Sequence, residues 1–134
     1  MILKKIVITI VLLAAIVVLI VVVEYFSTYV FPWHRESAIK ATIEIGGLSK
    51  LPYDLNNLEI EKYGGMFTRQ FIIKFHSSKE EIQNWINKSK RLKSATPKSN
   101  GLKKTYEIYP GENGTFGGKV EIQGNDVLID MSSS

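Results

Sequence analysis

The chain has no cysteine, and it has only two histidines and four prolines. The absence of cysteine excludes disulfide bonds, thiolate metal sites, thiol nucleophiles and a lipid-modified N-terminal cysteine. A transition-metal site would need His34 and His76 together with carboxylates, and their sequence contexts favour interfacial or solvated roles instead. The sequence therefore predicts no metal site and no cofactor.

Strong charge of one sign is also lacking. The formal net charge is +4, and without Lys4 and Lys5 the rest of the chain carries 15 basic against 13 acidic residues. A net charge of this size does not indicate a nucleic-acid partner. The most basic stretch has no interleaved aromatic residues, so it gives no support for binding single-stranded nucleic acid.

The one long apolar run is Ile6 to Val23, which contains 18 residues and no charge. As a helix rising about 1.5 Å per residue, it nearly crosses a hydrocarbon core of roughly 30 Å. It is longer than the core of a secretory signal, and it ends in bulky residues where a signal peptidase needs small ones. The sequence therefore predicts an uncleaved single-pass transmembrane signal anchor.

The orientation of this anchor is predicted from the basic residues near its ends. Lys4 and Lys5 directly precede the apolar run, whereas Arg35 lies twelve residues beyond Val23. Basic residues are enriched on the cytoplasmic side. We therefore expect a cytoplasmic N-terminus and an extracytoplasmic domain in the cell envelope, with the reverse orientation as the alternative.

An aromatic cluster follows the anchor, before Pro32 disfavours a helical conformation at Phe31. Aromatic side chains of this kind gather at the level of lipid headgroups. The predicted membrane-interface residues are Tyr25, Phe26, Tyr29, Phe31 and Trp33.

The remaining chain is long enough for one small domain. The predicted divisions are a short N-terminal tail (1–5), the anchor (6–23), an interfacial aromatic linker (24–36), a small domain (37–131) and a polar tail (132–134).

The domain is predicted to belong to the α+β class, with an antiparallel sheet of about six strands and one packed helix. Alternation of apolar and polar residues, or flanking turn residues, indicates each strand. The expected strands are Ile39–Ile45, Leu58–Glu61, Met66–His76, Thr105–Tyr109, Lys119–Gln123 and Asp126–Met131. In the third strand, Phe67 is expected to share a face with Phe71, Ile73 and Phe75, after a turn at Tyr63–Met66.

The one helix is expected to begin after Ser77-Ser78, because each serine has a glutamate three residues later, as in a capping box. It should end near Arg91 to Lys93 and be seated on the sheet by Trp85. The breaker-rich segment Lys93 to Lys104 is predicted to be a mobile loop.

Three local patterns resemble catalytic signals but do not predict a catalytic site. The glycine-rich Gly111–Lys119 segment departs from a phosphate-binding loop and leads into a strand. Ser37 and Lys40 match Ser-x-x-Lys without its companion motifs, and a strand would place them on opposite faces. The carboxylates of Asp126 and Asp130 share a strand face, as solvated residues often do. No catalytic residue is predicted.

The most informative surface feature is a basic stretch with no acidic residue inside it. Its members are Lys88, Lys90, Arg91, Lys93, Lys98, Lys103 and Lys104. Such a surface suits lipid headgroups, an acidic polymer or an acidic protein. A solvated helix end and loop in a lysine-rich protein would give the same pattern.

These features predict a membrane-anchored, non-enzymatic binding module whose partners are the bilayer, through Ile6 to Val23, and a protein near the membrane. The protein would bind an exposed sheet edge or the basic stretch. One alternative is a subunit of a larger membrane complex. Another is a small membrane-tethered hydrolase with a pocket that collects Asp126, Asp130 and His76.

Overall fold

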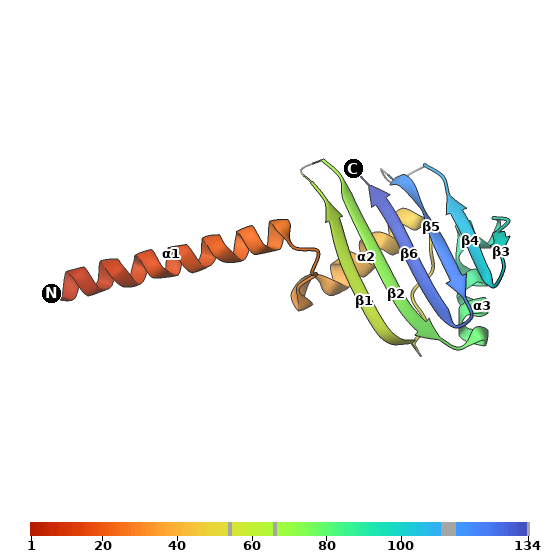
Figure 1. Cartoon of the computed structure of the whole chain (residues 1–134), viewed down its shortest axis with the longest axis horizontal. Helices are drawn as coiled ribbons and strands as arrows, with labels where there is room; N and C mark the ends of the chain where they lie inside the picture. Colours follow the sequence, from red (N-terminus) through yellow and green to blue (C-terminus); the bar gives the residue numbers. More distant parts are fainter. Residues whose placement is uncertain (54, 66, 111–114, 134) are drawn as a thin grey trace.

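The computed structural model describes residues 1–53, 55–65, 67–110 and 115–133. A long helix, α1 (Ile2–Phe26), projects from one side of a domain that holds the other elements (Figure 1). Within the described ranges α1 is the one helix long and apolar enough to cross a membrane. The later elements are η1 (Pro32–His34), α2 (Arg35–Gly46), β1 (Leu55–Gly64), β2 (Arg69–Ser77), α3 (Lys79–Lys88), α4 (Lys90–Lys93), β3 (Lys98–Asn100), β4 (Lys103–Ile108), β5 (Thr115–Gln123) and β6 (Asp126–Ser133).

The six strands form one antiparallel sheet in the order β1-β2-β6-β5-β4-β3. The last strand in the chain, β6, therefore lies inside the sheet, where Ile129 pairs with Ile73 on one side and Val120 on the other. Helices α2 and α3 lie behind one face of the sheet, and no helix of the described chain covers the other (Figure 1). This architecture confirms the predicted α+β class.

The expected first strand, Ile39–Ile45, is wrong, because these residues lie within helix α2. The residues that α2 buries are Ala38, Thr42 and Gly46, which recur every four residues and let the helix approach the sheet closely. The Thr42 hydroxyl donates a 2.7 Å hydrogen bond to the carbonyl of Ala38. Gly47 then ends the helix in the left-handed conformation, with φ of 60°. In the sequence, the larger apolar residues of this segment alternate with polar ones. This alternation predicted a strand instead of a helix that buries small residues.

The sixth strand comes instead from the predicted mobile loop. Within Lys93 to Lys104, residues Lys98–Asn100 form β3 and pair with the start of β4, so the loop prediction is wrong for that part. The three residues of β3 form an edge too short to show periodicity in the sequence. The predicted polar tail is also partly strand, because β6 extends to Ser133, which pairs with Arg69. Ser134 lies outside the described residues.

The predicted helix start is confirmed at α3. Ser78 is its N-cap, and the serine hydroxyl accepts a 3.2 Å hydrogen bond from the amide of Glu81. The helix breaks at the buried Ser89, whose hydroxyl donates a 2.7 Å bond to the carbonyl of Trp85. Helix α3 therefore ends at Lys88, earlier than the predicted Arg91 to Lys93, and a separate turn, α4, covers the remaining residues up to Lys93.

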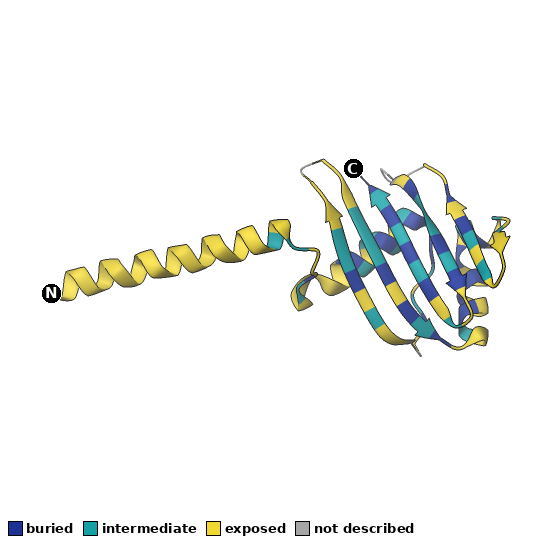
Figure 2. Cartoon of the chain, viewed as in Figure 1, coloured by how far each residue is buried: buried dark blue, intermediate teal, exposed yellow. Residues whose placement is uncertain are grey.

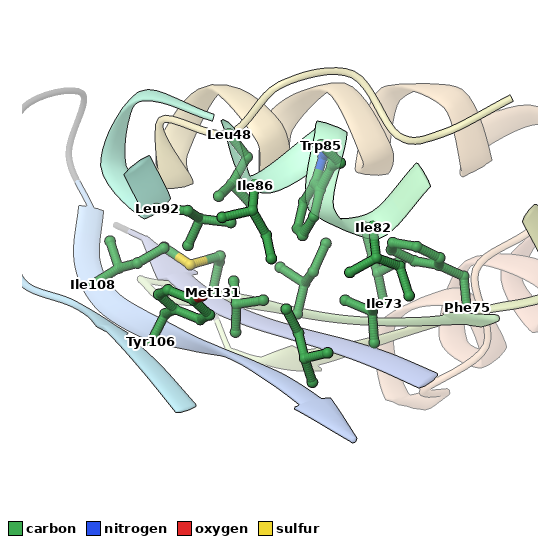
Figure 3. Packing of buried hydrophobic residues seen from close by; sticks show 14 of the residues in the cluster. Leu48, Ile73, Phe75, Ile82, Trp85, Ile86, Leu92, Tyr106, Ile108 and Met131 are labelled. Carbon is green, nitrogen blue, oxygen red and sulfur yellow. The ribbon is translucent and has the colours of Figure 1, made fainter. Parts of the chain in front are cut away.

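Trp85 holds α3 against both the sheet and the chain that follows α2. Its side chain is 2% exposed and meets Phe75 of β2 edge to face, with ring centroids 5.8 Å apart. The indole N–H donates a 3.0 Å hydrogen bond to the carbonyl of Ser49. Figure 3 shows Ile82, Trp85 and Ile86 pointing from α3 toward the sheet. The predicted role of Trp85 is confirmed.

The turn between the first two strands differs from the expected one. Gly64 pairs with Arg69, and the amide of Gly65 donates to the carbonyl of Thr68, so β2 begins after Phe67. Phe67 therefore lies in the β1–β2 connection with 82% of its surface exposed, not on the core face of a strand. Met66, the last residue of the expected turn, lies outside the described residues.

Candidate functional site

The segment that leaves α1 is attached to the outer edge of β1. Two residues after α1 ends at Phe26, the carbonyl of Thr28 accepts a 2.9 Å hydrogen bond from the amide of Lys62. Tyr29 forms an antiparallel β-bridge to the same strand, and Val30 is buried in the hydrophobic core. The apolar helix therefore meets the domain at its β1 edge, with almost no free chain between them (Figure 1).

Two side-chain contacts fasten the start of α2 at the same place. His34 Nε2 lies 2.7 Å from Glu24 Oε1, in the last part of α1. The neighbouring Arg35 donates a 2.6 Å hydrogen bond from its guanidinium to the carbonyl of Leu58 in β1. These contacts bring η1 back to the level at which α1 ends.

The five predicted interface aromatics gather at this junction. Phe31 and Trp33 stack with their ring centroids 4.8 Å apart and their planes 4° from parallel. Tyr29 meets Phe31 edge to face at 5.6 Å, and Tyr25 meets Phe26 in the same way at 5.0 Å. All except Phe31 are exposed, and Figure 2 shows α1 exposed along its length up to the junction.

The predicted basic residues lie at the opposite end of the domain. They belong to α3, α4, β3 and β4, and the sheet order places β3 and β4 farthest from β1. In Figure 1, α3 and β3 lie on the side of the sheet away from α1. The tertiary structure therefore separates the basic stretch from the aromatic junction by the width of the sheet.

Two of the seven cations are paired with acids. Lys98 Nζ lies 2.8 Å from Glu107 Oε1, and this hydrogen bond lowers the pKa of Glu107 and raises the pKa of Lys98. Lys103 Nζ lies 3.6 Å from Glu121 Oε1. Both pairs lie on the helix-free face of the sheet, because Lys98 is opposite Thr105, which alternates along β4 with the buried Tyr106.

Arg91 has a structural role. Its guanidinium donates a 3.3 Å hydrogen bond to the carbonyl of Tyr109, and its amide donates to the carbonyl of Gly47. A Cβ placed on Gly47 would lie 2.8 Å from Arg91 Cγ, so the stem of the arginine covers the end of α2. Removing this side chain would disturb packing as well as charge.

Four cations of the stretch remain: Lys88, Lys90, Lys93 and Lys104. All four are exposed, and in the described part of the chain none of them forms an ion pair. Lys104 alternates with Lys103 along β4, so it lies on the same side of the sheet as the helices. We call these four residues the distal lysine surface.

The helix-free face of the sheet alternates acids with bases. Lys119 lies opposite Glu107 on β4 and opposite Asp130 on β6. Its ammonium donates a 2.9 Å hydrogen bond to Glu121, which lowers the pKa of that carboxyl. Charges on this face therefore largely compensate one another.

A shallow depression of about 320 Å³ lies on this face. Its charged and titratable lining residues are Glu59, Lys74, His76, Lys103, Glu121 and Asp126. His76 Nδ1 and Asp126 Oδ1 are 2.9 Å apart, so two of the three residues considered for a hydrolase do meet. Asp130 does not line the depression and instead accepts a 2.7 Å hydrogen bond from Gln70. The side chain of Asp126 is 78% exposed, which is an ordinary solvated setting for a carboxylate.

The other candidate catalytic patterns gain no supporting geometry. Ser37 and Lys40 lie three residues apart on α2, so the expectation of opposite strand faces is wrong, and both are exposed. Residues 111–114 of the glycine-rich segment lie outside the described residues. The segment leads into strand β5, which begins at Thr115, and not into the helix that a phosphate-binding loop requires. Among the described residues, no three His, Asp or Glu side chains form a group that could hold a metal ion.

The exposure of Phe67 at the surface was not predicted from the sequence. Its position between paired glycines and a strand of alternating polarity made it look like the first core residue of β2. The exposure of Phe67 follows from the pairing of Gly64 with Arg69, and the sequence alone does not specify that pairing.

Comparisons of the chain with models of known protein families, with curated proteins and with solved structures found no match.

Proposed function

We propose that this protein is a membrane-anchored binding module that presents the distal lysine surface to an acidic partner protein. Helix α1 is the anchor, with the apolar run Ile6 to Val23 inside the bilayer. Its N-terminus is cytoplasmic, and the domain lies on the extracytoplasmic side. The support for this orientation is the pair Lys4 and Lys5 directly before the run.

The observation that carries the proposal is the position of the distal lysine surface. Four exposed lysines without ion pairs in the described chain lie at the end of the sheet farthest from α1. Headgroups of the bilayer that holds α1 are reached most easily from the β1 edge, so this position favours a partner approaching from beyond the domain. A surface of one charge sign attracts a partner of the opposite sign and raises the rate of association.

A protein partner is favoured over a bare acidic polymer by the sheet edge at the same end. The short strand β3 pairs only with Lys103 to Thr105, and in the described chain no strand pairs with the outer edge of the rest of β4. Unpaired strand edges accept extended peptides through backbone hydrogen bonds. Lysines and an open edge together suit an acidic extended segment.

A photo-crosslinking residue introduced at Lys90 in the host cell tests the proposal, with one at the exposed Lys40 of α2 as the control. We expect a discrete protein adduct at position 90 and none of the same mass at position 40. The triple variant Lys88→Gln, Lys90→Gln, Lys93→Gln should lose the adduct formed from a crosslinker at Lys104.

The matched control is Lys40→Gln, Lys50→Gln, Lys79→Gln, which removes the same charge from exposed positions elsewhere. It should keep the adduct at Lys104, and rising salt should weaken the adduct in the parent protein. An adduct that survives the distal triple variant at low salt would remove the lysine surface from the proposal. Adducts with polysaccharide instead of protein would show that the partner is an acidic polymer and not a protein.

A further inference from the structure

The domain has almost no freedom to move away from the end of α1. The hydrogen bond between Thr28 and Lys62 begins two residues after the helix ends at Phe26, and Val30 is already in the core. The contact between Glu24 and His34 fixes the other side of the junction. If α1 crosses a bilayer, the β1 edge must therefore lie at the surface of that bilayer.

Exposed aromatic side chains lie on this edge. Trp33 is 65% exposed, and its neighbour His34 contacts the last part of α1, so the indole lies at the level where α1 ends. Phe31 stacks beneath it. This pair comes from the chain that precedes α2.

A third aromatic comes from a different part of the chain. Phe67, which is 82% exposed, lies in the β1–β2 connection. Lys62, which bonds to the exit segment, is only two residues before Gly64 at the end of β1. In Figure 1 the β1–β2 connection and the chain between α1 and α2 both lie on the side of the domain that faces α1, the connection at the end of β1 and the other segment beside the strand.

We propose that the domain docks onto the surface of the bilayer that holds α1 through these three aromatics, Phe31, Trp33 and Phe67, which we call the docking surface. Aromatic rings are favourable at the headgroup level, where an apolar body meets a polar boundary. The exposed Arg69 flanks Phe67 and can reach lipid phosphates from beside it. Docking at the β1–β2 connection and at the segment beside β1 sets the sheet upright, with β3 and the distal lysine surface directed away from the membrane.

This inference rests on the proposed anchor but not on the acidic partner. The chain has no cysteine, so a single introduced thiol carries a fluorescent label at one known position. Thr68→Cys places the label beside Phe67 and keeps the aromatic ring. Leu102→Cys is the matched control, because Leu102 is 86% exposed in the β3–β4 connection at the far end of the sheet.

Each labelled full-length protein is reconstituted into bilayer discs of phosphatidylcholine and phosphatidylglycerol. Lipids that carry a spin label near the headgroup then quench any fluorophore at the bilayer surface. We expect quenching several-fold stronger at position 68 than at position 102. Adding Phe67→Ser and Trp33→Ser should reduce quenching at position 68, while the near-ultraviolet dichroism of the buried Trp85 shows that the domain remains folded.

Equal, weak quenching at positions 68 and 102 would overturn the docking surface. So would a label at position 68 that is shielded from iodide in water yet not quenched by the labelled lipid, because a protein would then cover the site. Alkaline carbonate extraction distinguishes failure of the proposed anchor from failure of the proposed docking. A chain released by carbonate refutes the anchor, whereas a retained chain with an unquenched label at position 68 refutes docking alone.

Discussion

The amide of Lys62 donates a 2.9 Å hydrogen bond to the carbonyl of Thr28 and so joins the edge of the sheet to the chain leaving α1. This bond partly occupies an edge that would otherwise be open to another chain. Val30, two residues after Thr28, is 7% exposed and packs in the core. The segment between the apolar helix and η1 is therefore part of the folded domain.

Replacing Val30 by alanine should lower the free energy of unfolding of the domain by about 1–2 kcal/mol, because two methyl groups leave the core. Denaturant unfolding of the full chain in detergent micelles, followed by tryptophan fluorescence, measures this change. Val18→Ala in α1 is the control, since Val18 is 62% exposed and contributes nothing to the core. Equal midpoints for the two variants would show that the exit segment does not stabilise the domain.

Trp85→Phe should destabilise the domain by about 1–3 kcal/mol, because the carbonyl of Ser49 loses its hydrogen-bond donor inside the protein. Trp85→Ala should cost more, about 3–5 kcal/mol, since it also leaves a cavity beside Phe75. The same denaturant titration, followed by far-ultraviolet dichroism, gives both values. Similar losses for the two variants would show that packing of the ring against Phe75 adds little beyond the hydrogen bond.

Gly118→Ala should destabilise the domain by at least about 2 kcal/mol, because its Cβ would overlap the carbonyl oxygen of Asp130 across the β5–β6 pair. A Cβ on Gly65 meets no described atom within 4 Å, so Gly65→Ala is the matched control. Thermal melts of both variants compare the two positions. A melting temperature for Gly118→Ala close to that of the control would contradict the close approach of these strands.

Acid should weaken the domain partly through Glu121. Its hydrogen bond from Lys119 lowers the pKa of Glu121 below its ordinary value of 4.5. The stabilisation is therefore present above that value and is lost as the pH falls through the lowered folded pKa. Lys119 is shifted the opposite way, so its contribution is present below 10.5 and is lost as the pH rises through the raised folded pKa.

Glu121→Gln should remove up to about 1 kcal/mol at neutral pH, a small value because the side chain of Lys119 is 45% exposed. The variant should also show a flatter dependence of unfolding free energy between roughly pH 5 and pH 3. Glu44→Gln on the exposed part of α2 changes the net charge equally and serves as the control. An unchanged acid slope in Glu121→Gln would refute the role of this pair.

Protease digestion of intact cells and of inverted membrane vesicles tests the predicted orientation. The domain should be protected in inverted vesicles, and the protected fragment should retain Met1 and α1, as the predicted uncleaved anchor requires. Mass spectrometry of the fragment identifies its ends. Digestion in inverted vesicles would place the domain in the cytoplasm and reverse the predicted orientation.

The long apolar helix α1, the α+β class, the role of Trp85 and the start of α3 could all be predicted from the sequence. Each depends on residues that are neighbours in the chain: an uninterrupted apolar run, alternation along a strand, or a serine three residues before a glutamate. Local patterns of this kind can be read from the sequence because the hydrogen bonds and burial of a single element already require them.

The helical state of residues 35–46, the exposure of Phe67 and the division of the basic stretch depended on the tertiary structure. Helix α2 is stabilised by burying Ala38 and Thr42 against a sheet whose strands come later in the chain. Lys98 and Lys103 are neutralised by acids on other strands, so the sequence alone made seven cations look alike. The sequence determined which elements can form. Long-range strand pairing decided which side chains share a surface, because residues distant in the chain become neighbours only in the folded sheet.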